Sequence, residues 1–259
     1  ISPDGKELLF ADVGSCRFVS LDLETGEAKT ALAPFHERPQ NNVNKNALTD
    51  WRMHKGVIAT EPLHEEGCGG SFEWYQQRAA MTLGEPFHNP TDIDYDSQGN
   101  MYISDGYGNC AVHKFDKDGN FVKTWGGNGY DHFFDNVDTP GKFLVPHSLA
   151  VDAKDHIWVC DREKDAVHVF DTDGNLLFYA KGDLGQPSGV DANSKYIYVC
   201  GRAGYLTIFD TDFNIVAELG EFNGDLRAHS VACDEDGNVY LFPTHANTEH
   251  QVIALKAIK

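Results

Sequence analysis

The sequence predicts an all-β fold, a six-bladed β-propeller with four-stranded blades. Short stretches that are apolar, or that alternate apolar and polar residues, are separated by turns rich in Asp, Gly and Asn, which is typical of strands. The same order of strands and turns returns after about 41 residues, the length of one propeller blade. The 259 residues therefore accommodate six blades in a single domain, 1–259.

The segment 144–173 contains the three successive strands from which the repeat is read. A proline-led apolar strand over 145–151 is followed by a tight polar turn, a second strand over 156–160, a charged turn and a third strand over 166–170. Each predicted strand is about five residues long and is either apolar throughout or alternates apolar and polar residues. This periodicity is that of a strand and not of a helix. This segment supplies the template with which the rest of the chain is aligned.

Four first strands align on short motifs that begin at Pro90, Pro146, Pro187 and Ala228, which are 56, 41 and 41 residues apart. The long step is a repeat plus a loop over 127–141. The second strands also align, and they are followed by turns of similar composition in all four copies. Their segments are 101–107, 157–163, 197–203 and 239–245. Residues of different blades that occupy the same position in the repeat can therefore be compared directly.

The two ends of the chain and blade two are less regular. Residues 6–12 and 17–22 are predicted as second and third strands of blade one, so its first strand is absent. Blade six has three predicted strands and lacks the fourth. We expect closing strands from a segment before Ile1, since an unpaired edge is a liability. The predicted strands of blade two are 46–52, 56–60, 71–77 and 79–83, and those of blade six are 227–233, 238–242 and 250–256.

Charge and composition exclude some partners. The net charge of −19 and the pI near 4.8 argue against nucleic acid as a ligand. No run of 18 apolar residues occurs, so no membrane span is predicted. We expect a monomer that acts on a small molecule or a peptide. Of the six cysteines, Cys160 and Cys200 occupy equivalent strand positions and are interpreted as free buried thiols.

Two histidines lie where first strands begin. In a propeller the first strands line the central channel, so His147 of blade four and His229 of blade six should point toward the axis at one end. Alternate blades of six are about 120° apart, which lets three such residues share one metal ion. Imidazole suits zinc and its neighbours. The blade-two position falls near Asn46 or Ala47, and water or another histidine is an alternative third ligand.

A second cluster is predicted in the turns that follow the second strands. Tyr107, Arg162, Arg202 and His245 occupy comparable positions there, on the same face as the first-strand ends. An arginine can hold a carboxylate through two hydrogen bonds. A tyrosinate beside a metal could accept a hydroxyl proton. We therefore assign Tyr107 and Arg162 as candidate catalytic residues, and Arg202 and His245 as candidate substrate-binding residues.

These motifs resemble the NHL-repeat propeller of peptidyl-α-hydroxyglycine α-amidating lyase. The resemblance is strongest over 86–170, and weaker over 227–255. It implies zinc held by three histidines, active-site roles for Tyr107 and Arg162, and a structural calcium ion. It also implies cleavage of a carbon–nitrogen bond to give an amide and glyoxylate, in a secreted or periplasmic protein. The motifs of this sequence that carry the resemblance are Pro90-Thr91-Asp92, 105–109, 145–149 and Asp161-Arg162-Glu163.

Two other functions stay open at this point. The segments 1–12 and 46–60 are similar to gluconolactonase and regucalcin propellers, which would make the protein a metal-dependent lactonase with Asn46 as a ligand. A non-catalytic NHL interaction propeller is the third class. The Asp-rich turns 116–120, 171–175 and 210–214 lack the glutamate of a calcium loop and are predicted as hairpin turns. Substrate, metal and compartment are not fixed by the sequence.

Overall fold

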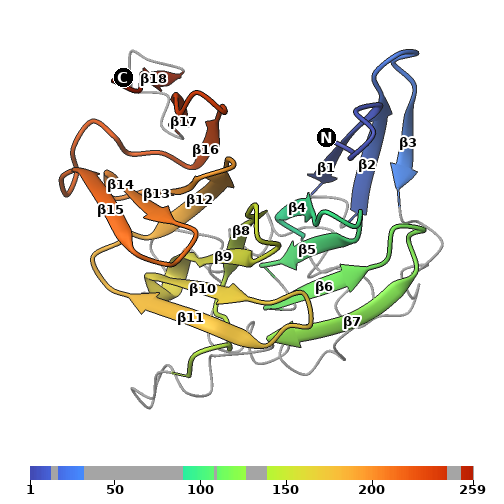
Figure 1. The fold of residues 1–259 in the computed structure, drawn as a ribbon, viewed down its shortest axis with the longest axis horizontal. Helices are drawn as coiled ribbons and strands as arrows, with labels where there is room; N and C mark the ends of the chain where they lie inside the picture. Colours follow the sequence, from blue (N-terminus) through green and yellow to red (C-terminus); the bar gives the residue numbers. More distant parts are fainter. Residues whose placement is uncertain (13–16, 32–89, 108–109, 127–138, 244–251, 259) are drawn as a thin grey trace, which may run out of the picture. The chain divides into compact units, whose positions relative to one another are not determined.

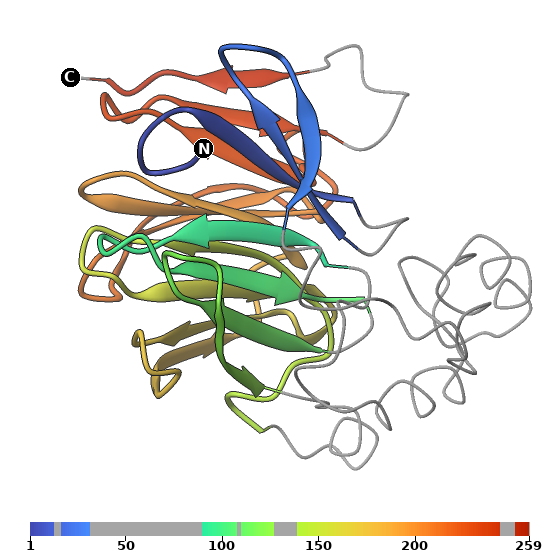
Figure 2. The same cartoon turned by 90° about the vertical axis from the view of Figure 1, so that its right-hand side faces the viewer.

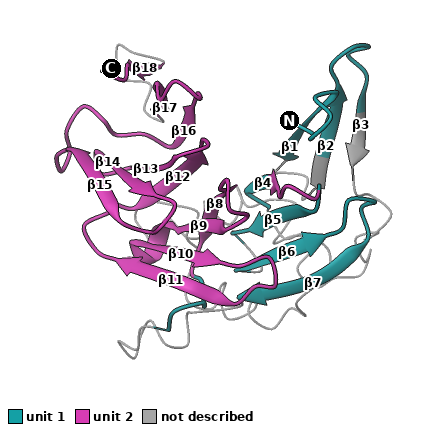
Figure 3. Ribbon diagram, viewed as in Figure 1, with its two compact units in different colours: residues 1–93, 99–143 teal, residues 94–98, 144–259 magenta. Residues whose placement is uncertain are grey.

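The computed structural model describes residues 1–12, 17–31, 90–107, 110–126, 139–243 and 252–258. These residues form five sheets of antiparallel strands (Figure 1). They fall into two units, one of residues 1–93 and 99–143 and the other of residues 94–98 and 144–259 (Figure 3). Each unit is described below by itself, and the prediction of a single domain stays a prediction.

The first unit contains two sheets. The first strand of the second of these sheets ends with two residues, Asp94 and Tyr95, that belong to the second unit. One sheet has the strand order β1-β2-β3 and the other β4-β5-β6-β7. The strands are β1 (Glu7–Asp12), β2 (Arg17–Asp22), β3 (Ala28–Ala31), β4 (Asp92–Tyr95), β5 (Met101–Asp105), β6 (Ala111–Phe115) and β7 (Phe121–Gly126). The first two strands agree with the second and third strands predicted for blade one.

The second unit contains three sheets, with the orders β8-β9-β10-β11, β12-β13-β14-β15 and β16-β17-β18. The first strand of the middle sheet, β12, contacts the first strands β8 and β16 of the other two sheets. Figure 2 shows the sheets stacked face to face. The strands are β8 (Pro146–Val151), β9 (Ile157–Asp161), β10 (Ala166–Phe170), β11 (Leu176–Lys181), β12 (Pro187–Ala192), β13 (Tyr196–Gly201), β14 (Tyr205–Asp210), β15 (Ile215–Gly220), β16 (Ser230–Cys233), β17 (Val239–Phe242) and β18 (Ile253–Leu255).

The Asp-rich turns close hairpins, as predicted. In the turn between β10 and β11, the Asp171 carboxylate accepts the backbone N–H groups of Asp173 and Asn175 at 2.9 and 2.8 Å. Gly174 takes a φ of 75°, which glycine adopts without strain. The same hydrogen bonds recur around Asp116 and Asp210. Hydrogen bonds from the turn hold the pKa of these two carboxyls below the usual value.

An aromatic cluster packs the sheet of β8–β11 against that of β12–β15. Trp158 is fully buried in β9, and its ring centroid lies 5.2 Å from that of Phe209 and 5.7 Å from that of Phe213. Its indole N–H donates to the Asp152 carboxylate at 2.9 Å, which satisfies the one polar group of this side chain. Phe178 of β11 borders the same cluster.

Side chains also link the first strands of neighbouring sheets. The Asp94 carboxylate accepts the backbone N–H of Val151 at 2.7 Å, and Asp191 accepts that of Cys233 at 2.7 Å. Burial raises the pKa of Asp94 to about 6, and the charge of Asp191 adds to the effect. Burial also raises the pKa of Asp191. Each link therefore keeps a carboxyl group in surroundings that disfavour its ionised form.

Most predicted strands agree with the structure within a few residues, and the four-stranded repeat is confirmed. The strands predicted for blade two lie outside the described residues. The charged turn after β9 contains a single 3₁₀ turn, η2 (Arg162–Lys164), which the sequence pattern did not indicate. Cys160 and Cys200 are buried thiols that form no disulfide, as interpreted. Within the described ranges, no helix is long and apolar enough to cross a membrane.

Candidate functional site

His147 stands at an irregularity in the pairing of β8 with β9. Pro146 faces Asp161 and Ser148 faces Cys160, so one residue of β8 is left over at His147. A bulge of this kind bends the strand and turns the extra side chain out of the regular alternation. The imidazole is 6% exposed, so the bulge places a polar ring in a buried position.

The backbone of the next sheet fixes the tautomer of His147. Its Nδ1 lies 2.6 Å from the carbonyl oxygen of Ser188, and since a carbonyl can accept but not donate, Nδ1 carries the proton. Ser188 occupies the same place in β12, between Pro187 facing Gly201 and Gly189 facing Cys200. The Nε2 atom of His147 is therefore the nitrogen with the lone pair, the form in which histidine binds metals.

His229 lies beside His147, as their equivalent positions predict. The ring centroids are 4.6 Å apart and the planes are inclined by 85°. His229 directly precedes β16, and its backbone N–H donates to the carbonyl of Phe242 at 2.9 Å. Both histidines belong to the second unit, so the fold of that unit alone brings them together.

Two arginines add positive charge to this pair. Burial and the Arg162 guanidinium hold the pKa of His147 well below its usual value, with further contributions from His229 and Arg202. Burial, Arg162 and Arg202 lower the pKa of His229 to about 4. Both imidazoles are therefore neutral at pH 7, and the guanidinium groups make the site attractive to an anion.

Arg162 is more deeply buried than Arg202. It follows β9 directly, is 2% exposed, and its Nε donates to the Glu163 carboxylate at 2.8 Å. Its backbone N–H donates to the carbonyl of Val145 at 3.1 Å, which ties it to the segment leading to His147. The Glu163 bond uses the Nε–H, and the Nη groups carry four further N–H donors. Arg202 follows β13 and is half-buried.

The spacing of the two imidazoles is what a shared metal ion would require. Two imidazoles on one tetrahedral zinc have ring centres about 5 Å apart, from a zinc–nitrogen distance of about 2.1 Å. The separation of 4.6 Å between His147 and His229 is close to this value. A proton donated from the other ring nitrogen to a backbone carbonyl is typical of metal-binding histidines. Among the described residues, no three His, Cys, Asp or Glu side chains form a metal-binding group.

The structure thus brings together four predicted residues, His147, His229, Arg162 and Arg202. Tyr107 lies in the first unit, half-buried in the turn after β5. Asn46 and His245 lie outside the described residues.

The sequence reasoning missed two contributors to the site, the Ser188 carbonyl and Glu163. The repeat alignment contained a signal for the first, because Ser188 is the counterpart of His147 in the next copy. No sequence pattern distinguished Glu163 from the other acidic residues of the turns, because its role depends on the side-chain direction of its neighbour Arg162.

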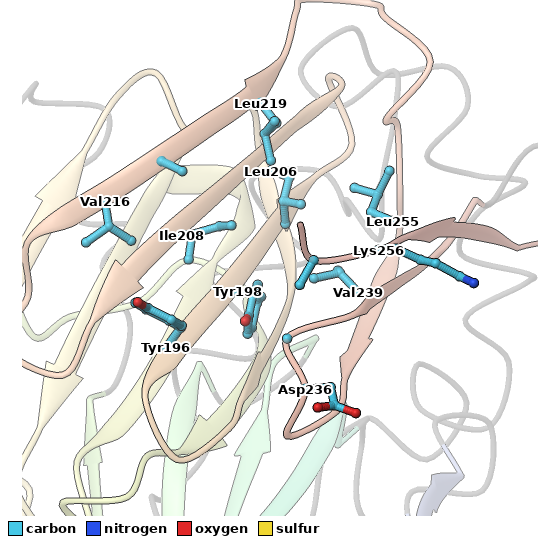
Figure 4. A pocket seen from close by; sticks show the side chains of 13 residues that line it. Tyr196, Tyr198, Leu206, Ile208, Val216, Leu219, Asp236, Val239, Leu255 and Lys256 are labelled. Atoms are coloured by element: carbon cyan, nitrogen blue, oxygen red, sulfur yellow. The ribbon is translucent and has the colours of Figure 1, made fainter. Parts of the chain in front are cut away.

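A separate pocket of about 400 Å³ lies between β13–β15 and the sheet of β17 and β18. Figure 4 shows Tyr198, Leu206 and Leu255 around it, with Asp236 and Lys256 at its edge. None of the predicted site residues lines this pocket. Its lining is mostly apolar and lacks the convergent polar groups of the histidine–arginine cluster.

Comparison with known proteins agrees with the fold. The model of the NHL repeat matches residues 143–170, which include His147 and Arg162. A solved structure of a gluconolactonase from Xanthomonas campestris has a TM-score of 0.56 over 94% of this chain and 67% of its own, at 12% identity. The protein is therefore a β-propeller that contains an NHL repeat.

Relatives with known names agree with the resemblance seen in the motifs. The chain is 39% identical over 184 residues to peptidylglycine alpha-amidating monooxygenase of Rattus norvegicus, covering 62% of this chain and 18% of the relative. It is 28% identical over 231 residues to peptidyl-alpha-hydroxyglycine alpha-amidating lyase 1 of Drosophila melanogaster, covering 77% and 40%. The chain spans about a fifth of the length of the curated relatives it matches first. The resemblance to amidating lyases is confirmed.

Proposed function

We propose that the protein is a metal-dependent carbon–nitrogen lyase that cleaves an N-acyl-α-hydroxyglycine, such as a peptidyl-α-hydroxyglycine, into an amide and glyoxylate. The observation that carries the proposal is the pair of neutral imidazoles, His147 and His229, next to the guanidinium groups of Arg162 and Arg202. Such a cluster offers metal ligands and an anion-binding surface side by side. The name of one relative, peptidyl-alpha-hydroxyglycine alpha-amidating lyase 1, supports the same reaction.

The substrate carries a carboxylate, for which the two arginines are suitable partners. Arg162 binds it through its Nη groups, because its Nε–H is engaged by Glu163. Arg202 adds a second positive charge from the neighbouring sheet. In this arrangement, the arginines orient the substrate so that its hydroxyl group faces the histidines.

His147 and His229 would hold a divalent ion, most simply zinc, with Asn46, another histidine or water as the third ligand. When bound, the ion polarises the substrate hydroxyl and makes its proton more acidic. A structural calcium ion, implied by the family resemblance, is a separate proposal that no described group supports by itself.

Tyr107 is the proposed base of the reaction. The phenolate accepts the hydroxyl proton while the carbon–oxygen double bond of glyoxylate forms. The carbon–nitrogen bond breaks with its electron pair on nitrogen, and the proton returns to that nitrogen to give the amide. Atoms and charges then balance without a further reactant.

The decisive experiment measures glyoxylate and benzamide released from α-hydroxyhippurate by the purified protein with added zinc. We expect equimolar products, and we expect chelation of the metal to stop their release. The variant carrying both His147→Ala and His229→Ala serves as the inactive control. Hydrolysis of a sugar lactone without glyoxylate release would assign the protein to the lactonases. No activity on either substrate would favour an NHL propeller that binds a partner without catalysis.

A further inference from the structure

The buried carboxylate at the end of β9 has a structural role next to the site. Asp161 is fully buried, and its two oxygens accept the backbone N–H of Leu144 at 2.9 and 3.2 Å and that of Val145 at 2.8 Å. These N–H groups precede β8, whose second residue is His147. One carboxylate thus binds the backbone that leads to a proposed metal ligand.

Asp161 also immediately precedes Arg162. Its position therefore affects both Arg162 and the backbone that leads to His147. Asp161 faces Pro146 in the strand pairing, and the backbone N–H of Arg162 donates to the carbonyl of Val145 at 3.1 Å. The start of β8 and the end of β9 are therefore joined by side-chain and backbone bonds on either side of the bulge at His147.

A second buried histidine borders this carboxylate from the adjacent strand. His168 of β10 is fully buried, and its Nε2 lies 3.6 Å from Asp161 Oδ2. The His168 ring packs at 4.7 Å from the ring of Tyr179 and parallel to that of Phe170. His168 and its aromatic neighbours therefore pack beside the Asp161 carboxylate.

We propose that Asp161, backed by His168, is a positioning residue that sets the geometry between His147 and Arg162. By holding the N–H groups of Leu144 and Val145, its carboxylate fixes the backbone that leads into β8, from which His147 reaches the Ser188 carbonyl. The functional consequence of this inference rests on the proposed function, whereas its structural part concerns the apo protein and can be tested by itself.

The neighbouring sheet has an equivalent bulge without this carboxylate. In β13 the residue at the corresponding register position is Gly201, opposite Pro187. A Cβ added there would lie 2.4 Å from the carbonyl oxygens of Leu184 and Gly185, so the backbone occupies the space that a side chain would need. This sheet contributes a carbonyl, that of Ser188, and not an imidazole at its bulge.

The experiment compares Asp161→Asn with Asp152→Asn. Asp152 is a matched control, because it is also buried in the β8–β9 pair and accepts N–H groups from Lys154, His156 and the Trp158 indole. It lies in the turn between the two strands, at the end away from His147. Both variants should lose stability, since an amide replaces a carboxylate that accepts several hydrogen bonds.

Two readouts separate positioning from general stability. In the zinc-free protein, nitrogen NMR of the His147 ring should show the Nδ1–H tautomer in the wild type and in Asp152→Asn, and a mixture of tautomers in Asp161→Asn. Zinc affinity, measured by competition with a chelator, should fall about 10-fold or more in Asp161→Asn. It should change less than about 2-fold in Asp152→Asn, as distant sites act independently.

Unchanged His147 tautomer and zinc affinity in Asp161→Asn would overturn the proposal, and so would equal changes in both variants. If Asp161→Asn does not fold, His168→Gln provides the same comparison with a smaller expected shift. Should the wild type neither bind zinc nor release glyoxylate, the proposed function fails. The tautomer comparison would then still decide whether Asp161 positions His147.

Discussion

At the scale of single residues, the neutral state of two neighbouring imidazoles, His147 buried and His229 half-buried, determines what the site can bind. Removing both rings should abolish stoichiometric zinc binding. We expect about one zinc ion per chain in the wild type and none in the variant with His147→Ala and His229→Ala, measured by elemental analysis after dialysis. His156→Ala, which changes a histidine bonded to Asp152 in the β8–β9 turn, is the control and should keep the ion. Equal zinc content in all three proteins would refute the assignment.

Arg162 should matter for turnover through its charge and its forked shape. Losing a charge-assisted contact to the substrate costs about 2–4 kcal/mol. At about 1.4 kcal/mol per factor of ten, Arg162→Ala should lower kcat/KM by about 30- to 1,000-fold. Arg162→Lys should recover little, since lysine cannot form the paired bonds. An Arg162→Ala enzyme with wild-type kcat/KM would contradict the role.

Tyr107 should be recognised by the kinetic constant that it changes. If the phenol takes part in proton transfer and not in substrate binding, Tyr107→Phe should lower kcat by about 10²- to 10⁴-fold. KM should stay within about 3-fold of the wild type, because the ring itself remains. The measurement is steady-state glyoxylate release. A raised KM with an unchanged kcat would instead assign Tyr107 to substrate binding.

At the scale of elements, the sheets of the second unit are joined by Trp158 and its aromatic neighbours. Trp158→Ala should destabilise the protein by about 3–5 kcal/mol in urea unfolding, because it leaves a large cavity. In a double-mutant cycle with Phe209→Ala, the two effects should differ from additivity by about 0.5–1.5 kcal/mol, as expected for contacting rings. Full additivity would show that the two sheets do not pack through this pair.

The sequence predicted these elements because the repeat imposes the same strand pattern on each copy. Trp158 and Phe209 fall on strands whose apolar residues are evident from the alternation. The bulge at His147 could not be predicted in this way, since it depends on the partner strand that Pro146 and Ser148 face. The hydrogen bond from His147 to Ser188 depends on the packing of two sheets, which no local pattern contains.

At the scale of the molecule, the links between first strands make stability depend on pH. Asp94 has a folded pKa of about 6, above the usual value of 3.8 for an aspartate. The folded state therefore binds a proton more tightly than the unfolded state, and this contribution to stability is complete below about pH 4. It is lost as pH rises from about 4 through 6. Asp116 and Asp210, whose pKa values are lowered, change stability in the opposite direction and at lower pH, as the pH falls below about 4.

The contribution of Asp94 is isolated by comparison with Asp94→Asn. The free energy of unfolding of the wild type, relative to the variant, should fall between pH 4 and pH 6 and be constant at higher pH. Urea titrations at several pH values measure this difference. A constant difference across the whole range would show that Asp94 ionises in the folded protein as it does in the unfolded chain.

The bond that orients His147 ends on a backbone carbonyl, and this has an evolutionary consequence. Every amino acid at position 188 supplies the same carbonyl oxygen, so a substitution there changes the side chain without deleting the acceptor. A point mutation of Ser188 therefore leaves in place the carbonyl that fixes the tautomer of His147. Side chains that fit the buried site at position 188 can therefore replace serine while the ring stays in place, and the arrangement is lost when an insertion or deletion shifts the strand.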